Sequence, residues 1–480
     1  MKIYNTLTKK IEEFKPNKDG EVNIYTCGPT VYHFAHIGNL RTYIFEDILV
    51  KTFEYIGYKV NRVMNITDVG HMTSDGDTGE DKMLKGAKRE HKTVYEIAKY
   101  YTDAFLNDMK SLNIEIPKVL VPASQNIDMY IRIIEKLLDN GYAYQENGNI
   151  YFDVSKVSNY YDLSGKNSEE LIIGARDDVT EDIHKRNPFD FGLWFTTSKF
   201  ENQAMKWDSP WGVGYPGWHI ECSGISIKYL GEYLDIHCGG VDNIFPHHTN
   251  EIAQSESYLG HRWCNYWMHG EHLNDSSGKM SKSKGEFLTL SVLKDKGYDS
   301  VVYRLFCLQS HYRNQLVFSY EAMDSTKQAY KKLINRINNI KSNVKENDKI
   351  DDLLIKSYLD KFSKCLENDL NTSSALTVLY DVLKDDSLSN KEKIEIIQKF
   401  DNVLSLNLLS SSENTIDNEL EKYILEMIEK RDVAKKNRNY EEADLIRNQL
   451  LEKGIILKDG RDGTTFEFSS IPKVNATFEG

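Results

Sequence analysis

Four side chains that could bind a metal ion stand in three separate segments of the sequence. Cys27 follows a run of strand-forming residues, and Cys222 ends the segment Pro-Gly-Trp-His-Ile-Glu-Cys. His247 and Glu251 stand four residues apart, so they share one face if a helix begins at Pro246. Two thiolates, one imidazole and one carboxylate make a plausible zinc site. The spacing also fits two cysteines buried in the core beside a surface or capping histidine, because the four residues lie far apart in the sequence.

The segment after Cys27 could bind an anion. It follows a predicted strand at residues 22–26 and opens a helix, where backbone N–H groups and the helix dipole attract negative charge. His36 and Asn39 add side-chain donors, and Gly38 lets a ligand approach the backbone closely. The alternative is a Gly/Pro loop closed by a capping asparagine.

Two lysines in a loop of small residues could contact a triphosphate. Lys279 and Lys282 belong to the segment Lys-Met-Ser-Lys-Ser. Their ammonium groups are mobile point charges, which suit phosphate oxygens. A lone pair of lysines at this spacing is usually a solvated turn, so the loop gains meaning only together with the segment around His36.

The elements that must position these residues begin with a strand at 22–26, a helix with apolar residues at helical spacing over 43–53, and a strand at 59–66. Strand, helix and strand in this order indicate a parallel sheet. Residues 114–212 are predicted to form an irregular insertion, after which the sheet resumes with a strand at 233–237. Helical periodicity predicts the remaining helices at 319–343, 351–368, 372–383 and 390–403.

The composition limits the class of protein. A chain of 480 residues exceeds what one core usually organises, so we expect two to four domains. The net charge of −13 argues against a general polyanion binder. The basic run at residues 430–438 could still contact one structured RNA, although it also fits a solvated helix face. Six scattered cysteines predict no disulfide framework, and the lack of a signal peptide or an apolar run of about 18 residues predicts a cytoplasmic protein without a membrane span.

Four segments taken together resemble the cysteinyl-tRNA synthetase family, which belongs to the class I aminoacyl-tRNA synthetases. They are Cys-Gly-Pro-Thr-Val-Tyr from Cys27, Pro-Gly-Trp-His-Ile-Glu-Cys-Ser through Cys222, Phe-Pro-His-His-x-Asn-Glu-Ile-Ala-Gln around His247, and Lys-Met-Ser-Lys-Ser from Lys279. The resemblance extends over almost the whole chain. The class signatures HIGH and KMSKS are present in this order, but the first reads HIGN, so Asn39 stands where a histidine is usual.

The resemblance implies an α/β fold whose Rossmann-like, parallel-sheet catalytic domain is split by an insertion. A C-terminal helical bundle and a small domain that contacts the anticodon follow it. The expected boundaries are 1–113 for the first catalytic half, 114–212 for the connective insertion, 213–310 for the second half with the KMSKS loop, 311–405 for the bundle and 416–480 for the small domain.

The resemblance also assigns one zinc ion to Cys27, Cys222, His247 and Glu251, with His248 a neighbour and not a ligand. Zinc favours thiolate and lowers the pKa of a bound thiol, so a metal that contacts the substrate sulfur would reject serine. An ordinary pocket discriminates a hydroxyl from a thiol only weakly, and no editing domain is expected.

In the implied reaction, L-cysteine and ATP form cysteinyl-adenylate and pyrophosphate, and cysteine then passes to the 3′ end of tRNA(Cys). His36, Asn39, Lys279 and Lys282 are the implied catalytic residues, and Mg²⁺ accompanies ATP. ATP contacts are implied for these four residues together with Thr30 and Gly38. The implied cysteine pocket consists of Thr67, Trp218, His237 and Asp242, the last of which would pair with the substrate ammonium. We expect a monomer.

Three departures from the family pattern stand beside these matches. Cys238 replaces a usual glycine, Thr249 a usual glutamate and Phe466 a common tryptophan. Cys238 could compete for the metal, although we favour a packed thiol.

Two rival functions share parts of this pattern. An ATP-dependent cysteine ligase that delivers cysteine to an amino-sugar would explain residues 1–310 but not the basic C-terminal segment. A non-catalytic zinc and RNA-binding module would have no use for a lysine loop that binds pyrophosphate.

Overall fold

The computed structural model of the chain describes residues 1–70, 83, 93–166, 183–197, 205–275, 278–279, 288–410, 418–436, 439–452, 455–460 and 463–468. The chain forms two compact units, Met1–Leu409 and Ser410–Gly480. No helix among the described residues is long and apolar enough to cross a membrane.

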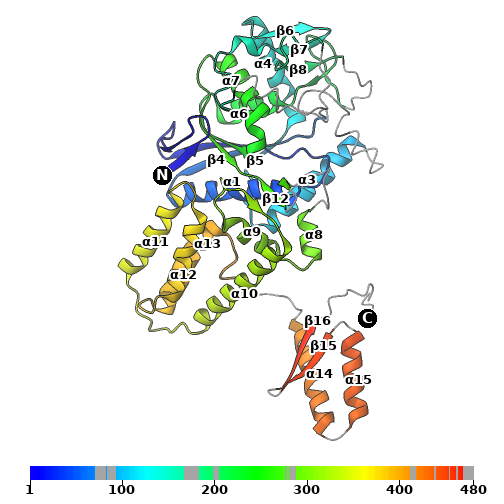
Figure 1. Ribbon diagram of the computed structural model, residues 1–480, viewed down its shortest axis with the longest axis vertical. Coiled ribbons are helices and arrows are strands. Elements are labelled where there is room, and N and C mark those ends of the chain that lie inside the picture. The colour runs from blue at the N-terminus through cyan, green and yellow to red at the C-terminus, as the bar shows by residue number, and fades with distance from the viewer. Residues whose placement is uncertain are drawn as a thin grey trace. The chain divides into compact units, whose positions relative to one another are not determined.

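A five-stranded parallel sheet lies at the centre of the first unit (Figure 1), in the order β11-β10-β3-β4-β5. The strands alternate little between apolar and polar residues because both faces of the sheet are covered. β3 pairs with β4 on one side and with β10 on the other, so the strand order reverses at β3. Ligands of open parallel sheets bind at such a reversal point. The bounds are β3 Glu21–Thr26, β4 Lys59–Ile66, β5 Val119–Pro122, β10 Leu234–Gly240 and β11 Cys264–Gly270.

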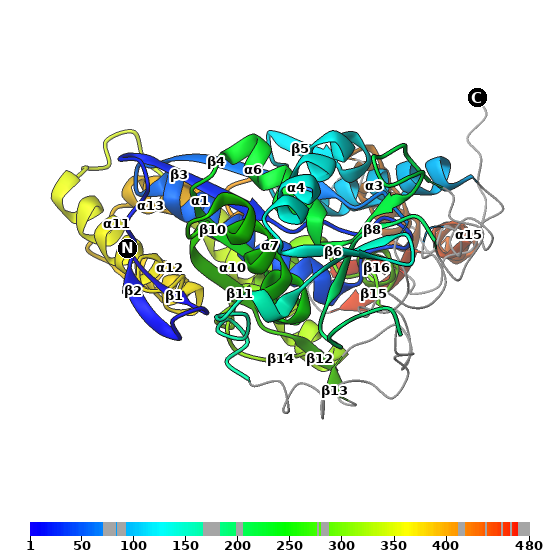
Figure 2. The same ribbon diagram turned by 90° about the horizontal axis from the view of Figure 1, so that it is seen from above.

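Helices cover both faces of this sheet (Figures 1 and 2). α1, Ile37–Tyr55, packs on one face with the helices that follow β11, and α4, α6 and α7 pack on the other. α3, Val94–Ser111, starts at a capping box of Thr93 and Glu96. The helices of the second face are α4 Ile127–Asp139, α6 His219–Leu230 and α7 Thr249–Leu259.

A four-stranded antiparallel sheet, ordered β6-β7-β8-β9, stands between the two halves of the parallel sheet in sequence. Its last strand meets the first turn of α6 at Gly217, where an added Cβ would lie 1.9 Å from the carbonyl oxygen of Gly192. The bounds are β6 Ala143–Glu146, β7 Asn149–Phe152, β8 Phe191–Phe195 and β9 Tyr215–Pro216.

The boundaries of this insertion differ from those expected at 114 and 212. β5 continues the parallel sheet after residue 113, and β9 still belongs to the antiparallel sheet after residue 212. Both strands are short, and their place is decided by partners far away in the sequence rather than by local periodicity.

A set of helices completes the first unit. The four longer ones, α10 to α13, begin and end within two residues of the ranges that periodicity predicts, and capping side chains such as Ser319 and Asp351 mark their starts. Their bounds are α8 Leu290–Asp295, α9 Ser300–Leu308, α10 Tyr320–Ser342, α11 Asp352–Leu366, α12 Thr372–Lys384 and α13 Asn390–Leu404. Short elements complete this unit: β12 Leu273–Asp275, β13 Gly278–Lys279, β14 Leu316–Val317, and the 3₁₀ turns Ala123–Asn126, Val154–Lys156 and Val241–Asn243.

The N-terminal hairpin joins the start of the chain to the helical region. It consists of β1, Lys2–Asn5, and β2, Lys10–Glu13. The Lys2 amide donates to the Glu367 carbonyl at 2.7 Å, and the Asp369 amide donates to the Lys2 carbonyl at 2.9 Å.

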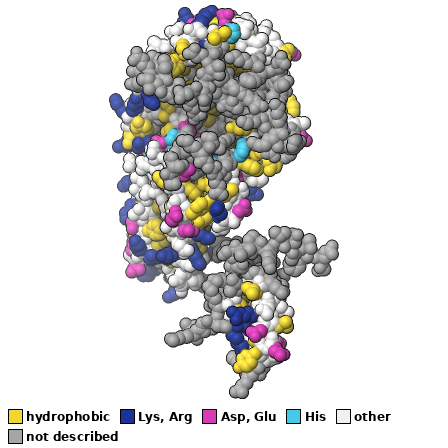
Figure 3. All heavy atoms as spheres, turned by 45° about the vertical axis from the view of Figure 1, so that its right-hand side comes forward, with side chains coloured by type: hydrophobic (Ala, Val, Ile, Leu, Met, Phe, Trp, Pro, Cys, Tyr) yellow, Lys and Arg dark blue, Asp and Glu magenta, His cyan; other side chains and the backbone are white. Residues whose placement is uncertain are grey.

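The second unit has its own small apolar core. Its helices are α14, Asn418–Lys436, and α15, Tyr440–Glu452, and its strands are β15, Ile455–Gly460, and β16, Gly463–Phe468. On the face seen in Figure 3, Lys and Arg side chains of this unit gather beside a few acidic ones. The core residues are Ile424, Met427, Ile428, Ile446, Leu450, Ile455 and Leu457.

Candidate metal centre and adjoining pocket

Two thiols, an imidazole and a carboxylate come together beside the carboxyl end of β3. The sulfurs of Cys27 and Cys222 lie 3.8 Å apart, and the Cys222 sulfur lies 3.5 Å from His247 Nε2. His247 Nε2 lies 3.1 Å from Glu251 Oε1. All four donor atoms lie within 4.8 Å of one another. The fold therefore brings together the four residues that the sequence singles out.

The donor set fits a zinc ion. Two sulfurs about 2.3 Å from one tetrahedral zinc lie about 3.8 Å apart, which is the separation of Cys27 and Cys222. Burial raises the pKa of both thiols, and it raises the pKa of Glu251 to about 8, against the smaller opposing effect of His247. Glu251 Oε1 accepts no hydrogen bond within the described residues although it is buried. A divalent cation would satisfy this oxygen and favour the deprotonated ligands.

The helix expected at Pro246 is present. Phe245 has an extended backbone (φ −138°, ψ 131°), and helical backbone follows it from Pro246 into α7, Thr249–Leu259. His247 and Glu251 therefore face the same point, and their side chains lie 3.1 Å apart.

A second layer of histidines surrounds the cluster. His219 Nδ1 lies 2.9 Å from His247 Nδ1, and His269 Nε2 lies 2.8 Å from His248 Nδ1. Such outer contacts fix the orientation of a ligating imidazole. No role is predicted from the sequence for His219 or His269. The feature of the sequence that could have indicated these two histidines is their polar character within otherwise apolar segments.

His248 lies closer to the cluster than a mere neighbour in sequence. Its Nε2 lies 3.3 Å from the Cys27 sulfur and 3.9 Å from Glu251 Oε1. Cys27, His237, His248 and Glu251 thus form a second possible donor set that shares two members with the first. Cys238 belongs to neither set found among the described residues and packs in the apolar core of the sheet, which agrees with a packed thiol.

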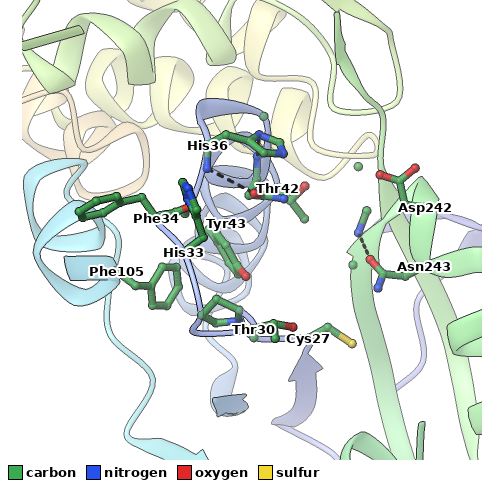
Figure 4. A pocket seen from close by; sticks show the side chains of 18 of the residues that line it. Cys27, Thr30, His33, Phe34, His36, Thr42, Tyr43, Phe105, Asp242 and Asn243 are labelled. Atoms are coloured by element: carbon green, nitrogen blue, oxygen red, sulfur yellow. Dashed lines mark hydrogen bonds between the residues drawn. The ribbon is translucent and has the colours of Figure 1, made fainter. Parts of the chain in front are cut away.

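A cavity of about 290 Å³ opens beside the cluster and is walled by the loop after β3, the start of α1, the end of β10 and residues 270–273. Figure 4 shows Cys27 at its base, Asp242 and Asn243 on one side, and His33, Phe34 and His36 on the other. Thr30, Gly38, Asn39 and Trp218 also line it. Cys27 is the member of the first donor set that reaches this cavity.

The start of α1 faces this cavity. The Asn39 amide donates to His36 Nδ1 at 3.2 Å, and the His36 amide donates to Asn39 Oδ1 at 3.4 Å, which makes a reciprocal cap. An added Cβ at Gly38 would lie 2.9 Å from the His36 ring, so a side chain here would displace the ring that caps the helix. A helix N-terminus with its amides toward a cavity is suited to an anion.

Of the two lysines, the structure describes the backbone of one. Lys279 lies in β13, where it pairs with Asn274. Lys282 lies outside the described residues.

The four expected cysteine-pocket residues separate into two pairs. Trp218 and Asp242 line the cavity; the Trp218 ring lies 4.3 Å from the His247 ring, and Asp242 Oδ1 lies 3.3 Å from His272 Nε2. Thr67 and His237 are buried behind the wall. Thr67 Oγ1 donates to Glu221 Oε2 at 2.8 Å, and His237 Nε2 lies 2.8 Å from Glu251 Oε2.

Comparison with known proteins agrees with this architecture. A family model described as the catalytic domain of class I (C) tRNA synthetases matches residues 13–328. A Mycobacterium tuberculosis methionyl-tRNA synthetase in complex with methionyl-adenylate has a similar fold, with a TM-score of 0.53 at 13% identity over 80% of this chain and 88% of that one. An Agrobacterium radiobacter leucyl-tRNA synthetase, solved as a ternary complex with tRNA, reaches 0.56 at 10% identity over 82% and 84%. The fold and the family match define a class I aminoacyl-tRNA synthetase.

Sequence relatives narrow this class. The chain is 47% identical to the cysteine–tRNA ligase of Treponema denticola over 97% of this chain and 99% of that one. It is 42% identical to that of Borrelia turicatae over 97% and 98%, and 39% identical to that of Zymomonas mobilis over 95% and 96%. The chain belongs to the cysteine–tRNA ligase family, as its four motif segments predict.

Proposed function

We propose that this chain activates L-cysteine with ATP and transfers it to the 3′ end of tRNA(Cys), with a zinc ion that selects the substrate thiol. The observation that carries the proposal is the convergence of Cys27, Cys222, His247 and Glu251 beside the cavity at the start of α1. As a member of its family the chain is a class I aminoacyl-tRNA ligase, whose substrates are an amino acid, ATP and tRNA.

In this proposal the metal site reads the side chain of the amino acid. Cys222, His247 and Glu251 are buried, whereas Cys27 is half-buried and lines the cavity, so the donor set is open on one side. A zinc ion bound there would favour the sulfur of cysteine over the harder, less acidic oxygen of serine. Trp218 packs beside the ligand His247 and would enclose the side chain.

The remaining cavity residues would hold the reacting groups. Asp242 offers a carboxylate to the substrate ammonium. Thr67 and His237 would support the pocket from behind, through Glu221 and Glu251.

Adenylate formation needs position and charge more than a side-chain nucleophile. In this proposal the cysteine carboxylate would attack the α-phosphorus of ATP and displace pyrophosphate, and Mg²⁺ bound to ATP would offset the charge of the phosphates. His36, Gly38 and Asn39 bring helix-terminal donors to the phosphates, with Thr30 at the same wall. Lys279 and Lys282 would neutralise the charge that develops on the departing pyrophosphate.

The second unit would contact the anticodon of the tRNA. Its support is the basic run at residues 430–438 and the Lys and Arg side chains visible on this unit in Figure 3. We propose that the first unit carries both chemical steps and that the second adds affinity for the correct tRNA.

The decisive experiment measures bound zinc together with charging of unfractionated tRNA by labelled cysteine. We expect one zinc per chain, cysteine-dependent ATP–pyrophosphate exchange and charging. Exchange without charging would favour an amino-sugar ligase, and zinc without exchange would favour a binding module; either result would refute the proposal.

A further inference from the structure

We propose that Arg41 is a positioning residue for adenylate formation, which fixes the cavity wall at Glu271 and His272 against the first turns of α1. This inference rests on the proposed function, because it concerns the geometry of the same cavity. Arg41 follows the HIGN segment by two residues, and neither motif includes it.

Arg41 is an almost fully buried cation bound to backbone carbonyls. Its side chain is 4% exposed. Nη1 donates to the carbonyls of Glu271 at 2.8 Å and His272 at 2.6 Å. Nη2 donates to the carbonyls of Asn314 at 2.6 Å and His311 at 3.4 Å. One guanidinium therefore joins α1 to two other segments of the chain.

The first of these segments forms a wall of the cavity. Glu271, His272 and Leu273 all line it, beside the start of α1, where an added Cβ at Gly38 would lie 3.6 Å from Leu273 Cβ. His272 Nε2 also contacts Asp242 Oδ1 at 3.3 Å. Arg41 therefore binds the backbone carbonyl of His272, and the ring of the same residue contacts Asp242, the proposed partner of the substrate ammonium.

The second segment braces the first. The Glu271 amide donates to the Tyr312 carbonyl at 2.8 Å, and the Leu316 amide donates to the His272 carbonyl at 3.2 Å. The Tyr312 ring stacks on Phe45 of α1 at 4.4 Å. The cluster formed by residues 271–273, residues 311–316 and α1 is therefore continuous, with Arg41 at its junction.

The first turn of α1 also contacts Leu288 and α9. The Ile37 amide donates to the Leu288 carbonyl at 2.9 Å, and the Tyr303 hydroxyl donates to the Ile37 carbonyl at 2.7 Å. The start of α1 is thus fixed by its own contacts, and Arg41 joins the wall at residues 271–273 to it.

A lysine could not replace this arginine. The guanidinium spreads its donors in a rigid, planar fork that spans several acceptors, whereas an ammonium is a compact point charge on a flexible stem. Arg41→Lys keeps the charge, and it would leave some of the four carbonyls without a donor. The wall would then shift relative to α1, and a displacement of about 1 Å costs on the order of a hundredfold in rate.

The test compares Arg41→Lys with a matched control, Arg304→Lys. Arg304 is also buried, donates to the backbone carbonyls of Leu404 and Leu112, and binds α1 through Asp47, but it does not contact the cavity wall. We expect Arg41→Lys to lower kcat for cysteine-dependent ATP–pyrophosphate exchange on the order of ten- to a hundredfold. Its bound zinc and its KM for ATP should stay within about twofold, as expected of lost positioning rather than lost binding. Arg304→Lys should lower the melting temperature and leave kcat, measured below that temperature, near the wild-type value.

Two further measurements separate positioning from a general structural role. His272→Ala should be non-additive with Arg41→Lys, because both would act through the same wall. Hydrogen exchange should speed up at residues 271–273 in Arg41→Lys but not at Ile37. If Arg41→Lys does not fold, Arg41→Gln carries the same measurements.

Unchanged kcat in Arg41→Lys, additive effects with His272→Ala, or unchanged exchange at residues 271–273 would each overturn the inference. Failure of the wild-type protein to catalyse cysteine-dependent exchange would instead refute the proposed function. Hydrogen exchange would then still decide whether Arg41 holds the wall.

Discussion

The donors of the candidate metal centre come from three segments that lie far apart in the sequence. Cys27 follows β3, Cys222 lies on α6, and His247 and Glu251 lie on the helical stretch that follows Phe245 and continues into α7. Gly28 keeps the first of these in place, since an added Cβ there would lie 1.6 Å from the Asn65 carbonyl oxygen. The centre therefore depends on the packing of three segments, and single ligand substitutions test it most directly.

Cys222→Ser and His247→Ala should each lose bound zinc and cysteine-dependent ATP–pyrophosphate exchange together. The reason is that each removes one of four ligands from a buried site. Metal analysis of the purified variants, run beside the exchange assay, checks this. Exchange that survives in a zinc-free variant would refute the role of the metal.

Cys264→Ser is the matched control for these variants. Cys264 is equally buried, but its sulfur lies 3.4 Å from the carbonyl oxygen of Tyr266, to which a serine hydroxyl can donate as well. Zinc content and exchange should both be retained.

Lys282→Ala should slow adenylate formation on the order of a hundred- to a thousandfold, the usual effect of removing a group that stabilises transition-state charge. Affinity for cysteine should stay nearly intact, since the metal site and Asp242 are untouched. Single-turnover kinetics beside equilibrium cysteine binding measure the two effects, and Lys345→Ala, at an exposed loop lysine, serves as the control. A comparable loss of cysteine affinity would mean that the loop has another role.

At the scale of residues, the motifs predicted which side chains meet but not how each one is used. The convergence of the four candidate donors was predictable from the four motif segments taken together, whereas residue types and spacing alone left buried core cysteines as an alternative. The burial of Thr67 and His237 and the contact of His248 with Cys27 were not, because they depend on side-chain directions across distant elements. Arg41 carries no local pattern at all, since its partners are carbonyls.

At the scale of elements, α1 is held from within the first unit by a buried charged group. Asp47 accepts from Arg304 at 2.7 Å and from Lys51 at 2.7 Å, and it also accepts from the Glu115 amide at 2.8 Å. Burial alone would raise the pKa of Asp47, but the two cations and the amide outweigh it and lower this pKa below its ordinary value of 3.8.

Asp47→Asn should destabilise the protein at pH 7 by about 3 to 5 kcal/mol, because it leaves buried cations without their partner. A lowered folded-state pKa gives stability that is present above the unfolded value near 4 and is lost as the pH falls through the folded value. The difference between wild type and variant should therefore shrink below about pH 4. Melting temperatures at pH 7 and at lower pH measure it.

Asp103→Asn is the control for this change. Asp103 pairs with Lys99 at 2.8 Å, but both side chains are exposed, so little change is expected at either pH. An equal loss in both variants would contradict the role of the buried group.

Periodicity predicted the long elements and missed the short ones. α10 to α13 each carry several turns of apolar spacing, whereas β5 has four residues and β9 two. A strand that short has no readable alternation, and its assignment to one sheet or the other rests on pairing with β4 or β8.

At the scale of the whole molecule, the two units have separate apolar cores, and among the described residues the core of the second consists of residues after 410. A chain that ends at Leu409 should therefore fold and keep cysteine-dependent exchange. Charging of tRNA should fall on the order of a hundredfold, the usual effect of losing a linked binding contact. Exchange and charging assays on the shortened chain check this, and equal loss of both would contradict a division of labour between the units.

The contact between Lys2 and residues 367 to 369 has a consequence for the order of events during synthesis. β1 can pair with β2 soon after both leave the ribosome, but the segment at residues 367 to 369 that bonds the Lys2 backbone emerges only after more than 360 further residues have been added. At about 5 to 20 residues per second this delay is roughly 20 to 75 seconds. β3 waits similarly for β10, which follows the entire insertion. The nascent first half therefore exposes unpaired strand edges for tens of seconds, and such edges promote aggregation. We expect chaperone supply and translation speed to affect the yield of active enzyme in a cell.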